Sequence, residues 1–203
     1  LTTRDTKSVD FFFFFLSVSP NGRYLLSAGW IWHPFEYIHL FEVTQALSTP
    51  STLDAGKLWL TRDGVTIPSG FVTDKRIIFT TGDDFYSEND IDEEQINLLP
   101  PQVIAQYNLS EKRIAHFAPL PETAGIIYPF SQNHVFSCYK HPKIVDLTTG
   151  EIVARWDEFQ TGEQVSSIVM DPGRFGPPIA IDPIKKRFAI ASDTEITVIQ
   201  MGE

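Results

Sequence analysis

The sequence predicts an all-β protein made of four antiparallel units, each with up to four strands. Aromatic residues make up 13% of the chain, including 16 Phe, and such side chains are enriched in strands. Stretches rich in Ala, Leu and Lys, which favour helices, are scarce. In addition, a strand-turn-strand pattern recurs with its starts 53, 58 and 53 residues apart. A repeat of this kind indicates that one supersecondary unit is used several times.

The second strand of each unit carries the repeat. It begins with a basic residue, continues as a short apolar run and ends in small residues. Its four copies are residues 23–29, 76–82, 134–139 and 187–192. A first strand precedes each copy across a polar turn, at residues 14–18, 70–72, 126–128 and 179–181. Pro, Asn, Asp and Gly in these turns favour hairpins.

Further strands follow each hairpin. Third strands are expected at residues 37–43, 103–109, 143–147 and 195–200, and fourth strands at residues 57–60, 113–117 and 152–156. Four antiparallel strands per unit at this spacing are typical of the blades of a β-propeller. The sequence therefore predicts a single propeller domain or the C-terminal portion of one, over residues 1–203, with about four blades at residues 10–61, 65–118, 124–157 and 165–203.

Two motifs resemble the WD40 and YVTN-like propeller superfamily. SVSPNGRYLLSAG at residues 17–29 is similar to its strand-turn-strand signature, and DLTTGEIVARW at residues 146–156 to its outer hairpin. The resemblance implies six to eight blades in a closed ring, whereas about four are found. Either residues 1–9 close a four-blade ring, or the chain is part of a larger propeller, which is the favoured interpretation.

Charge and composition narrow the classes of partner. With 16 basic and 26 acidic residues the formal net charge is −10, so nucleic acid and anionic membranes are not expected partners. The longest apolar run, residues 11–16, is too short to cross a bilayer. The single cysteine, Cys138, is expected to be a buried apolar residue, and its lack of a disulfide partner predicts a cytoplasmic protein.

Motifs for catalysis, cofactors and metals are not found. The chain has no phosphate-binding loop, no nucleophile elbow and no cysteine or histidine spacing for zinc, so no cofactor is expected. Residues 83–94 are rich in acids but have no glycine in the middle of the loop, which favours a solvated insertion over a calcium site. His39 and His116 alternate with apolar residues in strands, which predicts structural roles.

The candidate site is one end of the sheets. Loops from second to third strands, and from one unit to the next, emerge at the same end of an up-and-down sheet. Aromatic and charged residues on these loops are typical of a recognition surface. The residues expected to bind a partner are Trp30, Trp32, His33, Phe35, Asp83, Asp84, Tyr86, Lys140, His141 and Asp193.

These residues predict a non-enzymatic scaffold that binds a protein or peptide. The tryptophans Trp30 and Trp32 could instead pack between blades. The alternative function is a propeller hydrolase or lyase, in which Asp83, Asp84, Asp193 and His141 converge near the central channel. Open strand edges also predict self-association or pairing with further blades.

Overall fold

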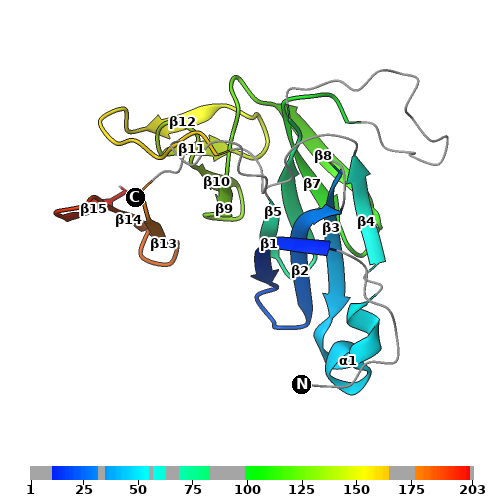
Figure 1. The fold of residues 1–203 in the computed structure, drawn as a ribbon. Coiled ribbons are helices and arrows are strands. Elements are labelled where there is room, and N and C mark those ends of the chain that lie inside the picture. The colour runs from blue at the N-terminus through cyan, green and yellow to red at the C-terminus, as the bar shows by residue number, and fades with distance from the viewer. Residues whose placement is uncertain are drawn as a thin grey trace.

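The structure is a computed structural model that describes residues 11–31, 35–54, 57–62, 69–82, 99–164 and 177–201. These residues form four antiparallel sheets that follow one another in chain order (Figure 1). In every sheet, strands that are consecutive in sequence are neighbours in space, and no sheet is closed by the described strands. The predicted all-β class is therefore confirmed.

The first two sheets have four strands each. The first sheet contains β1 (Phe11–Val18), β2 (Tyr24–Ile31), β3 (Phe35–Glu42) and β4 (Lys57–Arg62). The second sheet contains β5 (Ser69–Thr73), β6 (Arg76–Thr80), β7 (Val103–Asn108) and β8 (Arg113–Pro119). A short helix, α1 (Val43–Ser48), and a 3-10 turn, η1 (Pro50–Leu53), lie between β3 and β4, where the sequence predicted no helix.

The third and fourth sheets have shorter strands. The third contains β9 (Ile127–Pro129), β10 (His134–Ser137), β11 (Lys143–Asp146) and β12 (Ile152–Arg155). The fourth has three strands, β13 (Ile179–Asp182), β14 (Arg187–Ala191) and β15 (Ile196–Gln200). Every strand expected from the sequence overlaps one of these strands, so the strand predictions are confirmed.

The repeated basic residue has a structural role. In each sheet it approaches a polar side chain on a neighbouring strand, at the end of the sheet that carries the tight hairpin turns. The contacts are Arg23 with Glu42 at 3.4 Å, Arg76 with Gln106 at 3.1 Å, His134 with Asp146 at 3.8 Å and Arg187 with Asp182 at 3.1 Å. The sequence repeat therefore marks a recurring cross-strand contact rather than a site.

The core lies between successive sheets. Strand β6 illustrates the arrangement, because alternate side chains point to opposite faces of a strand. Ile77 and Phe79 pack on Leu26 and Ile38 of the first sheet. Ile78, on the other face, packs with Val135 of the third sheet. The second sheet is therefore covered on both faces.

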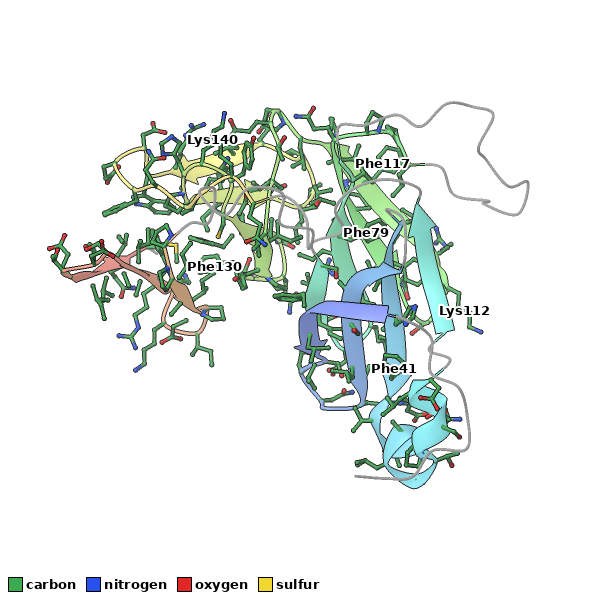
Figure 2. The ribbon with its side chains drawn as sticks, in the orientation of Figure 1. Phe41, Phe79, Lys112, Phe117, Phe130 and Lys140 are labelled. Atoms are coloured by element: carbon green, nitrogen blue, oxygen red, sulfur yellow. The ribbon has the colours of Figure 1, made fainter. Side chains whose placement is uncertain are left out.

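The third sheet repeats this pattern. Val135 contacts the second sheet, whereas Phe136 faces the fourth. The Phe136 ring lies 4.8 Å from the ring of Phe188 on β14. Phe130 also packs against this cluster, between the third and fourth sheets (Figure 2). The second and third sheets are thus each packed face to face on both of their chain neighbours.

The first three sheets meet along their first strands. Strand β1 contacts β5, and β5 contacts β9. The approach is so close at Gly70 that a Cβ atom there would lie 2.9 Å from the ring of Pro129. The Phe15 ring of β1 also lies 6.0 Å from that of Tyr128 on β9. The first strands therefore converge.

Among the described residues, no helix is long and apolar enough to cross a bilayer.

Candidate binding face

The best described part of the predicted binding face is the loop between β10 and β11. It carries Lys140 and His141. Asp193 lies in the exposed turn between β14 and β15. Trp30 and Phe35 lie near the facing ends of β2 and β3, where only their backbone is described. The other predicted residues, Trp32, His33, Asp83, Asp84 and Tyr86, lie outside the described residues, as does the whole acidic segment at residues 83–94.

Lys140 occupies a strained backbone position. Its φ is 61°, in the left-handed region that non-glycine residues rarely adopt. The N–H of His141 donates to the carbonyl of Tyr139 at 2.7 Å, which closes a tight turn centred on Lys140. Such strain costs about 1–3 kcal/mol and persists only where surrounding contacts enforce it.

A short ladder supplies those contacts. The Lys140 N–H donates to the carbonyl of Gly162 at 2.6 Å, and the N–H of Thr161 donates back to the carbonyl of Lys140 at 2.8 Å. The Lys140 side chain is exposed, and its Nζ lies 5.4 Å from the centre of the Tyr139 ring (Figure 2). The loop therefore presents a cation on a fixed backbone.

His141 is held beside Lys140 in one orientation. Its Nδ1 lies 3.0 Å from the carbonyl oxygen of Phe159, which can only accept, so Nδ1 carries the proton. In the neutral ring Nε2 then keeps its lone pair and can accept a hydrogen bond. The side chain is half-buried, so the ring is both anchored and accessible.

A buried lysine lies at the base of this loop. Lys143, the first residue of β11, is 1% exposed, and its ammonium group is paired with the carboxylate of Glu122. Its Nζ also lies 5.9 Å from the centre of the Tyr139 ring, so two lysines approach one aromatic ring. Burial lowers the pKa of Lys143, and the hydrogen bond and charge of Glu122 oppose that effect without cancelling it.

The acidic partner of Lys143 is shared. Arg155 Nη1 lies 3.2 and 3.3 Å from the two carboxylate oxygens of Glu122, and its Nε is paired with Asp157. Burial by itself raises the pKa of Glu122, but Lys143 and Arg155 together outweigh burial and hold that pKa below its ordinary value. The result is a chain of alternating charges, Lys143, Glu122, Arg155 and Asp157, along the end of the third sheet.

The described groups at this face can form charge-charge contacts and hydrogen bonds. Burial raises the pKa of Cys138 to about 12, so its thiol is not a nucleophile near neutral pH. No group of His, Cys, Asp and Glu that could hold a metal ion occurs among the described residues. Of the four residues of the enzyme alternative, only His141 and Asp193 are described, and no hydrogen bond between them is observed there.

No protein family model matches this chain, and no curated protein is significantly similar to it.

Lys140 and His141 are among the residues that the sequence predicts to bind a partner, whereas the charges beneath them were not predicted. Lys143 is the first residue of an otherwise apolar strand, and Glu122 is an isolated acid in a connecting loop. Neither has a spacing that distinguishes it from an exposed charge. The signal lies only in the fold, which brings residues 21 positions apart into contact inside the protein.

Proposed function

We propose that the chain is a β-propeller type binding scaffold and that its four sheets are blades arranged about a common axis. Two features support this arrangement. Each blade of a propeller packs face to face on its neighbours. Here three apolar clusters join successive sheets in the same way. The first strand of each blade lies nearest the axis, which agrees with the contacts of β5 with β1 and β9.

The binding site that we propose is the loop end of the third sheet, centred on Lys140 and His141. The observation that carries this proposal is the strained turn at Lys140, stabilised by hydrogen bonds to residues 161 and 162. Backbone strain that a structure enforces at an exposed loop is common at functional sites. The turn costs stability and exposes a cation, so a role in binding accounts for both.

The partner that suits this face is a protein or peptide segment that offers an acidic or carbonyl group to Lys140 and an N–H or O–H donor to His141. Lys140 supplies an exposed ammonium group, and His141 supplies Nε2 as an acceptor when neutral. The charges beneath the loop fix its position, because Lys143 is fully buried and paired. A rigid polar surface loses little conformational entropy when a partner binds.

A peptide library selection tests this function. The full chain is used to select peptides, and binding of each selected peptide is then measured by fluorescence anisotropy. Lys140→Ala and His141→Ala should each weaken binding by about tenfold or more, as expected for central contact residues. Lys185→Ala is the matched control, since Lys185 is an exposed lysine in the turn at the opposite end of the fourth sheet.

The outcome is decisive in either direction. Peptides that lose affinity for the Lys140 and His141 variants but not for the Lys185 variant support the binding face. Peptides that bind all variants equally, or a selection that enriches no peptide, would show that this loop is not the site.

A further inference from the structure

The fourth sheet has one strand fewer than the other three in the described part of the chain. In those sheets a fourth strand covers the outer edge of the third strand, as β4 does for β3. Strand β15 pairs with β14 on one side, and no described strand pairs with its other edge. An uncovered edge presents unpaired backbone groups that can join another strand.

The register shows which groups face outward. The N–H of Met201 donates to the carbonyl of Lys186, and the N–H of Ser192 donates to the carbonyl of Glu195. Hydrogen-bonded pairs alternate in an antiparallel ladder, so Thr197 and Ile199 are bonded to β14. The N–H and C=O groups of the intervening residues therefore point to the edge that no described strand covers. These residues are Ile196, Val198 and Gln200.

The same edge is apolar and exposed. The side chains of Ile196 and Val198 are 71% and 58% exposed. Their face of the sheet continues across the two neighbouring strands. Ala189 on β14 lies opposite Val198, and Ala180 on β13 lies opposite Ala189. Exposed β-branched residues on an edge strand are a typical surface for the addition of another strand.

Charge distinguishes this edge from the other outer edges. Strand β4 begins with Lys57 and ends with Arg62, β8 begins with Arg113, and β12 ends with Arg155. Basic residues on edge strands discourage pairing with further strands. Strand β15, by contrast, has no charged residue between Ile196 and Gln200. A second copy of this strand therefore meets no like charge along it.

We propose that β15 pairs with β15 of a second copy of the chain, antiparallel about a twofold axis. With Val198 on the axis, Val198 lies opposite its own copy and Ile196 lies opposite Gln200. Each of these residues then donates one backbone hydrogen bond and accepts one. The two sheets join into one continuous sheet, and the exposed Val198 side chains cover each other.

The first test is the oligomeric state of the full chain. Light scattering after size exclusion, at about 1 µM to 1 mM protein, should show a dimer whose fraction rises with concentration. Val198→Lys should give a monomer, because like charges would then face each other on the axis. Val153→Lys is the matched control, since Val153 is an exposed valine on the edge strand β12.

Thermal unfolding of each variant verifies that it is folded. A wild-type monomer over the whole range would overturn the proposal, as would a dimer that Val198→Lys leaves intact. Lys140→Ala should not change the dimer, so this test and the test of the binding face fail independently.

The second test is the register. Opposite residues of a hydrogen-bonded pair have Cα atoms about 5.5 Å apart, within reach of a disulfide. Val198→Cys should therefore cross-link to its own copy on oxidation. Ile196→Cys should not, because its two copies would be offset by about 13 Å along the strands. Cross-linking of Ile196→Cys without Val198→Cys would contradict the pairing. The buried native Cys138 should leave the wild-type protein uncross-linked.

Discussion

At the scale of single residues, the least usual feature is the buried ion pair of Lys143 and Glu122. Lys143 is almost completely inaccessible, whereas Glu122 is partly exposed and shared with Arg155. Removing one partner of a buried pair leaves an uncompensated charge, which is more costly than replacing the charge itself by an apolar group. The two residues should therefore respond differently to substitution.

We expect Glu122→Gln to lower the free energy of unfolding by about 2 kcal/mol, because Lys143 keeps its charge without a carboxylate. Lys143→Met should cost less, since the buried charge is removed and Glu122 still contacts Arg155. Urea unfolding of both variants measures the difference. A larger loss for Lys143→Met than for Glu122→Gln would contradict the assigned roles.

His39 gives the protein a pH dependence. It lies on β3 beside Phe41, with the two rings 6.0 Å apart, and burial lowers its pKa below the ordinary value of 6.5. As the pH falls through 6.5, the unfolded chain binds a proton at this residue before the folded chain does. Stability that is present above pH 6.5 is therefore lost as the pH falls toward the lower pKa of the folded state.

His39→Gln should reduce this loss. Between about pH 7.5 and 5.5 the free energy of unfolding should fall less in the variant than in the wild type, by up to about 1.4 kcal/mol, the linkage limit for the one pH unit between 6.5 and 5.5. Chemical unfolding at both pH values gives the comparison, in which the other histidines contribute equally. An identical loss in the two proteins would show that His39 does not titrate as described.

The sequence could predict residues whose role follows from a local pattern. The structural role expected for His116 is confirmed, because its Nε2 lies 2.7 Å from the carbonyl oxygen of Thr148. The burial of Cys138, which directly follows β10, is also confirmed. The pairing of Lys143 with Glu122 could not be predicted, since it depends on how a loop folds back over a strand.

At the scale of elements, the turn between β11 and β12 joins the third sheet to the second. Asp146 accepts hydrogen bonds from the N–H groups of Thr148 and Thr149, at 2.7 and 2.8 Å. Gly150 follows with a φ of 77°, and a Cβ atom there would lie 2.0 Å from the carbonyl oxygen of Pro119 on β8. Glycine is therefore required here both by conformation and by space.

Gly150→Ala should destabilise the protein by more than about 2 kcal/mol, because positive φ and a backbone clash act together. The control is Gly22→Ala. Gly22 has a similar φ of 72°, but nothing lies within 4 Å of a Cβ atom at that position, so a loss of about 1 kcal/mol is expected. Thermal unfolding compares the two variants, and equal losses would rule out the close approach to Pro119.

The helix α1 shows where prediction of elements failed. It has six residues, no side-chain cap and no buried residue, and Leu47 on it is 80% exposed. A helix this short has neither the length for an apolar stripe nor the capping residues that mark its ends. The strands were predictable because their alternation and turns repeat in four units.

At the scale of the whole molecule, successive sheets are held together by strands whose two faces are both apolar and buried. Ile77 and Ile78 are adjacent in sequence but face different sheets, and Val135 and Phe136 do the same. The sequence predicts such strands from their continuous apolar runs. It does not show which sheet each face meets, because that depends on contacts between residues far apart in the chain.

The measurement that tests the stacking of the sheets most directly is a disulfide between their first strands. In Gly70→Cys/Pro129→Cys the second cysteine replaces the ring that lies against position 70, so the two thiols should meet. We predict that oxidation joins residues 70 and 129 within a single folded chain, detected by mass spectrometry of the digested monomer. Gly70→Cys/Val153→Cys, with the second thiol on the outer strand β12, should stay reduced. A folded Gly70→Cys/Pro129→Cys protein that keeps both thiols free would contradict the convergence of β5 and β9 and, with it, the proposed arrangement of blades.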